Sequence, residues 1–236
     1  MANSMKTALI TGGTKGIGYG IAEVLISEGF RVAITGRNEE TVNEAAAQLN
    51  QLKEGFALGL VADVRDFESQ QKAVDRVTEQ WGGLDILVAN AGVGHFAPID
   101  TLTAEQWQET MDINLTGVFY SVKAALPALK KTKGYIITIA SLAGTNFFAN
   151  GAAYNASKFG LVGFTQAVML DVRNFGIKVT TIMPGSVATY FNNHEPSEKD
   201  AWKIQPEDIG QLVADLLRMN PRTLPSKIEV RPTMPK

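Results

Sequence analysis

The sequence predicts an α/β fold built on a doubly wound, parallel β-sheet of about seven strands with helices on both faces. Three observations lead to this expectation. Short apolar runs alternate along the chain with longer segments of helical periodicity. The apolar runs are continuous rather than alternating, which is typical of parallel strands covered on both faces. No linker, low-complexity tract or repeat interrupts the pattern, so residues 1–236 are expected to form a single domain.

The pattern predicts strands and helices that alternate along the chain. The expected strands are Thr7–Thr11, Arg31–Thr35, Ala57–Val61, Ile86–Ala89, Tyr135–Ile139, Lys178–Met183 and Lys227–Val230. The expected helices are Gly16–Glu28, Glu40–Leu52, Phe67–Gln80, Thr103–Leu129, Ala153–Phe175 and Pro206–Met219. Right-handed crossovers between such strands place the helices on the two faces of the sheet.

Composition argues against several classes of partner. Of the 236 residues, 19% are charged and the formal net charge is -2, so the chain lacks the basic surface that binds nucleic acid. There is no cysteine, which excludes disulfides and thiolate metal sites. The histidines, His95 and His194, lie far apart in the sequence, so we expect no metal site.

Membrane and export signals are missing from the sequence. No segment has the roughly 18 unbroken apolar residues of a membrane-spanning helix. Residues 1–6 lack the charged start and apolar run of a secretory signal, so a cytoplasmic location is expected. The sequence does not decide whether Met1 or Met5 is the native start.

A glycine-rich turn directly follows the first expected strand. It reads Thr11-Gly12-Gly13-Thr14-Lys15-Gly16-Ile17-Gly18, with the spacing G-x-x-x-G-x-G. Ligands of open parallel sheets bind at the carboxyl ends of the strands, where such a turn lets the backbone approach a pyrophosphate. The N-terminus of the helix behind it offers free N–H groups to the same anion. No lysine follows Gly18 as in a triphosphate-binding loop. A Rossmann-type dinucleotide site is therefore favoured over a tight turn that merely needs glycine.

The end of the second expected strand indicates which dinucleotide binds. A NAD site usually has an acidic residue there to hold the ribose 2′-hydroxyl. This chain has Thr35-Gly36-Arg37-Asn38, in which Arg37 can hold a 2′-phosphate. Lys15 could approach the same phosphate. We therefore predict NADP(H) over NAD(H), unless the strand runs further and Glu39 or Glu40 is its terminal acid.

Tyr154 and Lys158 lie four residues apart in an expected helix and therefore share one of its faces. A phenol is a weak acid with an ordinary pKa of about 10, and a nearby ammonium favours its ionised form. The pair could therefore act as a proton donor. Taken alone, the spacing is better explained by a Tyr154 ring that packs in the core and a Lys158 ammonium that faces solvent. The other motifs of the chain change that interpretation.

Several motifs occur in the order typical of one known family. After the glycine turn come Asp63-Val64, Asn90-Ala91-Gly92, Asp112-Ile113-Asn114, Ser141, Tyr154-Asn155-Ala156-Ser157-Lys158, and Pro184-Gly185 with Val187 and Thr189. In this ordered set, which covers most of the chain, the protein resembles the single-domain short-chain dehydrogenase/reductase family.

The resemblance implies a role for each of four catalytic residues. Tyr154 would be the general acid in reduction and the base in the reverse direction. Lys158 would lower the pKa of Tyr154 and hold the nicotinamide ribose. Ser141 would orient or polarise the substrate carbonyl, and Asn114 would hold a water that links Lys158 to solvent.

The resemblance also implies a set of cofactor contacts. Asp63 and Val64 would hold the adenine, and the segment 184–189 would position the nicotinamide carboxamide. The predicted cofactor-binding residues are Gly12, Thr14, Lys15, Gly16, Ile17, Gly18, Arg37, Asn38, Asp63, Val64, Asn90, Ala91, Gly92, Tyr154, Lys158, Pro184, Gly185, Val187 and Thr189.

Some of these residues also have a purely structural explanation. Ser141 could bond to backbone at a strand end, and Asn114 could satisfy a helix kink. Asp63 could be an ordinary loop acid or cap. Asn90 is interpreted as mainly structural, joining neighbouring strand ends.

The substrate region is expected after Pro184-Gly185. Residues 190–204 are predicted to form a short, charged lid with a mobile tip. The side chains expected at the pocket are His95, Phe96, Phe147, Phe148, Tyr190 and Phe191. Their rings favour an apolar ketone or acyl chain, unless they serve core or subunit packing.

Two classes of function remain open. The favoured one is an NADP(H)-dependent oxidoreductase that interconverts a ketone and a secondary alcohol. A 3-oxoacyl-carrier-protein reductase is the alternative enzyme, although the ending Ile228–Thr233 departs from the glycine-rich tail of the fatty-acid-synthesis reductases. The other class is a non-catalytic dinucleotide-binding sensor or scaffold on the same fold. The resemblance implies a homodimer or homotetramer.

Overall fold

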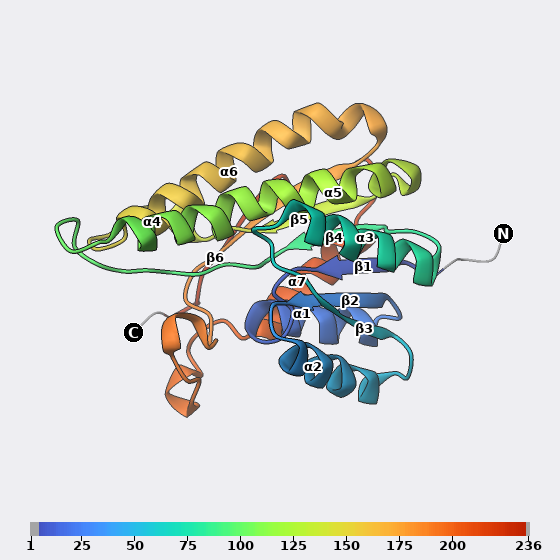
Figure 1. The fold of residues 1–236 in the computed structure, drawn as a ribbon, viewed down its shortest axis with the longest axis horizontal. Helices are drawn as coiled ribbons and strands as arrows, with labels where there is room; N and C mark the ends of the chain where they lie inside the picture. The colour runs from blue at the N-terminus through green and yellow to red at the C-terminus, as the bar shows by residue number, and fades with distance from the viewer. Residues whose placement is uncertain (1–4, 235–236) are drawn as a thin grey trace.

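The computed structural model describes residues 5–234 and contains one seven-stranded sheet in which every neighbouring pair of strands is parallel (Figure 1). The strands are β1 (Thr7–Ile10), β2 (Arg31–Gly36), β3 (Ala57–Val61), β4 (Ile86–Ala89), β5 (Tyr135–Ile139), β6 (Lys178–Pro184) and β7 (Lys227–Val230). Their order in the sheet is β3-β2-β1-β4-β5-β6-β7. The predicted fold class is confirmed, and Met1 lies outside the described residues.

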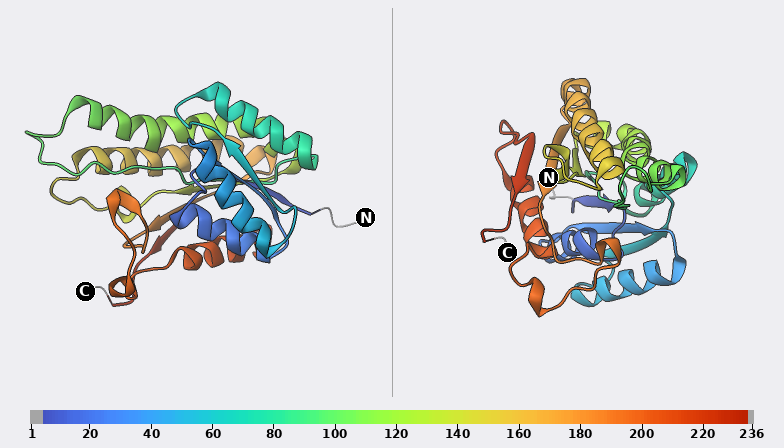
Figure 2. Two further views of the ribbon diagram at one scale, coloured as in Figure 1. Left: turned by 60° about the horizontal axis from the view of Figure 1, so that its bottom comes forward. Right: turned by 90° about the vertical axis from the view of Figure 1, so that its left-hand side faces the viewer.

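Helices cover both faces of the sheet (Figures 1 and 2). The helices are α1 (Gly16–Ser27), α2 (Glu39–Leu52), α3 (Phe67–Trp81), α4 (Ala104–Met111), α5 (Gly117–Thr132), α6 (Ala152–Val172) and α7 (Pro206–Arg218). The first, second and last of these pack on one face, whereas α3, α5 and α6 pack on the other. Among the described residues, no helix has the length and apolar character needed to cross a membrane.

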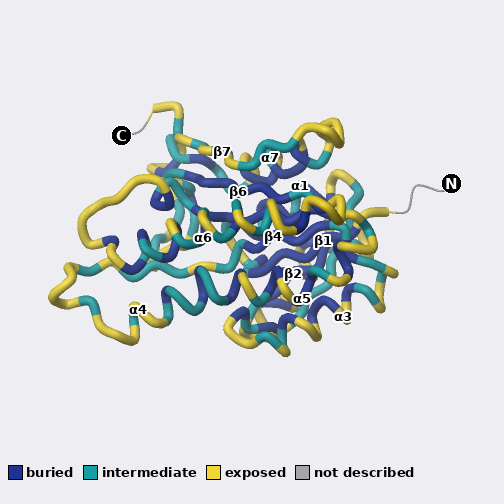
Figure 3. Tube along the Cα trace, turned by 90° about the horizontal axis from the view of Figure 1, so that it is seen from above, coloured by how far each residue is buried: buried dark blue, intermediate teal, exposed yellow. Residues whose placement is uncertain are grey.

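Successive residues of each central strand contribute to two different cores. Ile10 of β1 is fully buried with α1, α2 and α7, whereas its neighbour Leu9 packs with α3, α5 and α6. Figure 3 shows the central strands as a continuous buried layer. Burial on both faces therefore explains the continuous apolar runs. The expectation is wrong for the edge strands, because β3 is only partly buried and β7 alternates between exposed and half-buried residues.

The single helix expected over Thr103–Leu129 is interrupted. A π-helical segment, η1 (Asp112–Thr116), joins α4 to α5, and α5 runs on to Thr132. The apolar periodicity continues through this segment, so the sequence pattern did not reveal it. Asn114 lies in the middle of η1 and is fully buried.

The strand order reverses between β1 and β4, which places their carboxyl ends at the crevice of the sheet. The Asn90 side chain joins the two ends, because its Nδ2 donates to the carbonyl oxygens of Thr11 and Gly12, both at 2.9 Å. The Thr11 hydroxyl accepts from the backbone N–H groups of Asn90 and Ala91 at 3.0 and 3.1 Å. These bonds agree with the structural interpretation of Asn90. The part played by Thr11 was not anticipated.

Candidate active site

A cavity of about 1410 Å³ opens at the carboxyl ends of the strands. Its wall includes the glycine turn, the residues that follow β2, β4, β5 and β6, the first turns of α6, and the segment after Pro184. Of the predicted site residues, all but Gly18, Asn38 and Asn114 line this cavity. Residues separated by most of the chain therefore meet in one place.

The glycine turn has the backbone that its composition suggests. Gly12 and Gly16 have φ angles of +64° and +59°, which residues with a side chain rarely adopt. A Cβ at Gly12 would lie 2.9 Å from Ala91 Cα. Gly18 lies beneath the turn, where a Cβ would come within 2.5 Å of Asn90 Nδ2. Gly18 thus permits α1 to pack closely against Asn90 and the glycine turn. Contrary to the prediction, Gly18 does not line the cavity.

Arg37 follows β2 directly and lines the cavity. Asn38, expected to contact the cofactor, instead caps α2 by accepting a hydrogen bond from Thr41 N at 2.9 Å. Glu39 and Glu40 belong to the first turn of α2 and do not line the cavity. Neither glutamate is therefore a strand-end acid.

Asp63 lines the cavity, but its carboxylate already has a partner. Arg65 donates to both carboxylate oxygens, with the shortest contact, Nη2 to Oδ2, at 2.6 Å. This hydrogen bonding holds the pKa of Asp63 below its ordinary value. Asp63 therefore stays ionised and fixed in place near neutral pH.

Ser141 and Tyr154 are brought together by close packing of the segment after β5 on α6. Ser141 caps the short 3₁₀ helix η2 (Leu142–Gly144), where its Oγ accepts from Ala143 N at 3.1 Å. A Cβ at Gly144 would lie 2.8 Å from Lys158 O, so only glycine allows this approach. Burial raises the pKa of Tyr154, and a hydrogen bond with Ser141 acts in the opposite direction.

Asn155 holds the same segment from α6. Its Nδ2 donates to the carbonyl oxygens of Ala143 and Asn146, both at 2.8 Å. Asn155 was not predicted to be a site residue, although it lies between Tyr154 and Lys158 in the same expected helix.

Lys158 is buried, with its Nζ 5.6 Å from the centre of the Tyr154 ring. The ammonium donates to the carbonyl oxygen of Ile139 at 3.1 Å. Burial lowers the pKa of Lys158 to about 8, so the ammonium form still predominates at neutral pH. Gly92 leaves room beside it, because a Cβ there would lie 3.7 Å from Lys158 Nζ and 3.3 Å from Asn114 Oδ1.

The Asn114 side chain is hydrogen-bonded to three protein groups. Its Oδ1 accepts from Val93 N at 2.8 Å, and its Nδ2 donates to Val93 O at 2.9 Å and to Ser157 Oγ at 3.0 Å. It therefore joins η1, the segment after β4, and α6. Because Oδ1 can accept a second hydrogen bond, the water link to Lys158 stays a prediction.

The six side chains expected at the pocket, His95, Phe96, Phe147, Phe148, Tyr190 and Phe191, all line the cavity. His95 Nε2 lies 2.8 Å from Glu109 Oε2 on α4, which the sequence analysis did not identify. Lys203 and Arg231 also line the cavity and were also missed, because no motif spacing marks them. Lys15 Nζ lies 5.7 Å from the centre of the Tyr190 ring, so the glycine turn and residue 190 are neighbours. No cluster of three or more potential metal ligands occurs within residues 5–234.

A family model described as short chain dehydrogenase matches residues 6–200. The chain belongs to the short-chain dehydrogenase family. Like the relatives it matches, this short-chain dehydrogenase is an oxidoreductase. It is 38% identical over 189 residues to a trans-4-hydroxycyclohexanecarboxylate dehydrogenase of Sinomonas cyclohexanicum, a match that covers 78% of this chain and 73% of the relative.

Solved structures of other short-chain dehydrogenases and reductases have the same fold. An alcohol dehydrogenase from the archaeon Thermococcus sibiricus, complexed with 5-hydroxy-NADP, superimposes with a TM-score of 0.91 at 29% identity and covers 98% of this chain and 99% of that one. An actinorhodin polyketide ketoreductase with NADPH gives a TM-score of 0.87 at 32% identity, with 98% of each chain covered.

Proposed function

We propose that this short-chain dehydrogenase interconverts a ketone and a secondary alcohol, with NADP(H) as cofactor and Tyr154 as general acid and base. The observation that carries the proposal is that Ser141, Tyr154 and Lys158 line the same cavity as the glycine turn. A sensor would need the glycine turn but not these three side chains.

The residues of the cavity fit a dinucleotide. Gly12 and Gly16 carry no side chain, so the backbone is accessible where α1 begins. A Cβ at Gly16 would lie 3.3 Å from Thr189 Cγ2, so the glycine turn and the 184–189 segment lie close together. The turn would hold the pyrophosphate at the N-terminus of α1. Asp63 and Val64 would hold the adenine, and Lys158 the nicotinamide ribose. When bound, the nicotinamide exchanges a hydride with the carbonyl carbon.

The chain's own residues handle the proton. In reduction Tyr154 donates its phenolic proton to the carbonyl oxygen, and in oxidation it takes the proton back. Ser141 Oγ accepts from Ala143 N, and its hydroxyl, which otherwise bonds with Tyr154, would donate to the carbonyl oxygen of a bound substrate and stabilise the charge that develops there. The ammonium of Lys158 stabilises the phenolate that Tyr154 becomes. Asn114 would hold a water that links Lys158 to solvent, since its Oδ1 accepts one hydrogen bond and can accept a second.

Changing Tyr154 to Phe tests the proposal directly. The ring still packs, but no proton can be donated, so NADPH-dependent ketone reduction should fall by at least about 100-fold. The dissociation constant of NADPH, measured by fluorescence, should change little. Turnover that survives the change would contradict the role of Tyr154.

The preference for NADP(H) rests on Arg37, which directly follows β2 and lines the cavity, whereas Glu39 and Glu40 do not line it. The Arg37→Ala variant should weaken NADPH binding by roughly 10- to 150-fold, since a charge-assisted hydrogen bond to phosphate contributes roughly 1.5–3 kcal/mol. NADH binding should be unaffected. A wild-type protein that prefers NADH would contradict this assignment.

The substrate class is argued from the cavity wall. Aromatic side chains surround Tyr154, which suits an apolar ketone.

NADPH oxidation should be measured against monoketones, diketones and 3-oxoacyl thioesters. A preference for the thioesters would favour the 3-oxoacyl-carrier-protein reductase. NADPH binding without oxidation of any compound would favour the sensor. A cytoplasmic location stays a prediction.

A further inference from the structure

Two aromatic rings, those of Phe96 and Phe191, contact the ring of Tyr154. The ring centre of Phe96 lies 5.3 Å from that of Tyr154, and the ring centre of Phe191 lies 5.7 Å from it. Phe96 and Phe191 are themselves 6.3 Å apart. Phe96 comes from the segment after β4, whereas Phe191 comes from the segment after β6. Two distant segments thus meet over Tyr154.

The Phe191 ring occupies a space that exists because residue 94 is glycine. A Cβ at Gly94 would lie 2.6 Å from Phe191 Cζ and 2.9 Å from Phe96 Cζ. Carbon atoms that are not bonded to each other do not come this close, so any side chain at residue 94 would displace the rings. The ring of Phe191 therefore packs closely over Gly94, although 37% of the residue remains exposed.

The backbone around Phe191 forms a tight turn. Phe191 N donates to Thr189 Oγ1, and His194 N donates to Phe191 O, each at 3.3 Å. Between them, Asn192 and Asn193 have φ angles of +55° and +58°, which asparagine tolerates better than most residues. The turn therefore fixes where Phe191 leaves the chain.

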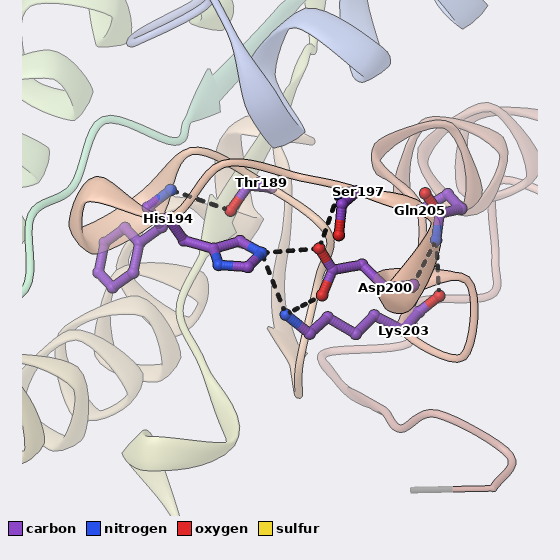
Figure 4. Close-up of polar contacts among 7 residues, drawn as sticks. Thr189, His194, Ser197, Asp200, Lys203 and Gln205 are labelled. Atoms are coloured by element: carbon purple, nitrogen blue, oxygen red, sulfur yellow. Dashed lines mark hydrogen bonds and ion pairs between the residues drawn. The ribbon is translucent and has the colours of Figure 1, made fainter. Parts of the chain in front are cut away.

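Asp200 anchors this turn from the far side of the segment (Figure 4). Its carboxylate is buried and lies 2.7 Å from His194 Nε2 and 2.6 Å from Lys203 Nζ. It also accepts from Ser197 N at 3.0 Å. His194 is three residues beyond Phe191, so the carboxylate holds the turn that presents the ring.

The base of the same segment is closed by backbone pairing. Ala188 N donates to Ile204 O at 2.9 Å, and Ile204 N donates to Ser186 O at 3.1 Å. Residues 188–204 therefore form a loop whose ends are fixed and whose interior is held by Asp200. The turn that carries Phe191 is therefore held both by backbone pairing at the ends of the loop and by Asp200 inside it.

We propose that Phe191 sets the upper size limit of the substrate and that Asp200 is the positioning residue that keeps it there. The inference rests on the proposed function, because it concerns the ketone that Tyr154 protonates. Because the rings of Phe96 and Phe191 already contact the Tyr154 ring, a ketone held at the Tyr154 hydroxyl must pack its substituents beside these two rings. The favoured substrate class is therefore compact, apolar ketones, and bulky substituents are excluded by Phe191.

The test compares cyclohexanone with 4-tert-butylcyclohexanone as substrates for NADPH-dependent reduction. Removing the ring in the Phe191→Ala variant should raise kcat/KM for the bulky ketone relative to the small one by about tenfold or more. The Phe191→Leu variant, which keeps an apolar side chain, should give a smaller rise. The matched control is Phe175→Ala, which removes a partly exposed ring outside the cavity and should leave the ratio unchanged.

The Asp200→Asn variant tests the positioning role. Asparagine keeps the size of the side chain but not the charge that pairs with Lys203 and His194. The ratio of kcat/KM values should shift in the same direction as in Phe191→Ala, mainly through a lower KM for the bulky ketone. Circular dichroism should confirm that the variant is folded.

The outcomes separate the two proposals. If Phe191→Ala and Phe191→Leu change kcat/KM equally for both ketones, the size limit is overturned while ketone reduction stands. If the Phe191 variants change the ratio of kcat/KM values for the two ketones but Asp200→Asn does not, the positioning role of Asp200 is overturned. If the wild-type protein binds NADPH but reduces neither these ketones nor any compound of the wider panel, the proposed function itself fails.

Discussion

Burial has opposite consequences for Tyr154 and Lys158. It raises the pKa of the Tyr154 phenol and lowers the pKa of the Lys158 ammonium to about 8. The family resemblance implies that Lys158 lowers the pKa of Tyr154, whereas in this structure burial dominates and the opposing effect comes from the hydrogen bond with Ser141. Tyr154 is protonated at neutral pH, as a proton donor for reduction must be.

The Lys158→Met variant should reveal the cost of burying this charge. The folded-state pKa lies below the ordinary 10.5, so the folded protein binds fewer protons than the unfolded chain between about pH 8 and 10.5. Wild-type stability from this residue therefore rises with pH through that window. The melting temperature of Lys158→Met relative to wild type should be highest at pH 7 and should fall as the pH approaches 10.5.

Thermal unfolding at pH 7 and pH 10 measures this difference, and Lys131→Met, an exposed lysine near the end of α5, is the control. A difference that does not change with pH would show that Lys158 carries no burial cost. Activity should be lost in Lys158→Met at every pH.

Sequence spacing located Tyr154 and Lys158 but not the residues that fix the segment after β6. A helix places residues four apart on one face, so their proximity follows from local geometry. Asp200 and His194 meet only because an irregular segment folds back on itself. Neither spacing nor periodicity encodes such a contact.

At the scale of elements, η1 interrupts what the sequence pattern presented as one helix. A π-helical turn adds a residue to the repeat and commonly marks a functional site. Here it directs Asn114 between Val93 and Ser157. The five central strands were predictable because both of their faces are apolar, whereas a single added residue in a helix barely alters the apolar pattern.

The Asn114→Ala variant should be destabilised by about 1–3 kcal/mol, because it leaves the N–H and C=O of the half-buried Val93 without their side-chain partner. Ser157→Ala is the comparison, since it keeps both Val93 bonds and should cost only about 1 kcal/mol. Urea unfolding measures both. Equal losses would show that Asn114 does not hold the segment after β4 in place.

At the scale of the whole molecule, α5 and α6 expose large apolar side chains on the face away from the sheet. Phe119 is 41% exposed, Phe159 44% and Leu170 53%. A homodimer or homotetramer would cover them, as the family resemblance implies. Sedimentation should show wild type as an oligomer, and a Phe119→Asp, Phe159→Asp double variant should dissociate. A monomeric wild-type protein would contradict this prediction.

The C-terminal helix α7 is held against α1 by two glycines, and this contact positions the glycine turn. A Cβ at Gly20 would lie 2.6 Å from the backbone carbon of Pro206, and one at Gly210 would lie 2.6 Å from Gly20 O. Alanine at either position should force the helices apart and cost about 1–3 kcal/mol in unfolding free energy. Gly163 of α6 is the control, because within the single chain an added Cβ has nothing within 4 Å, so Gly163→Ala should stabilise the chain's fold by up to about 1 kcal/mol when subunit contacts at this face do not involve residue 163.

The same contact should couple the end of the chain to its beginning. Because α1 begins at Gly16 in the turn, moving the helix in Gly20→Ala should also weaken NADPH binding, whereas Gly163→Ala should leave it unchanged. Urea unfolding and NADPH titration on the same preparations measure the two effects together. A Gly20→Ala variant that is destabilised but binds NADPH normally would show that the turn keeps its geometry independently of α7. Loss of both properties would establish that packing at residues 206–210 supports the cofactor end of the cavity.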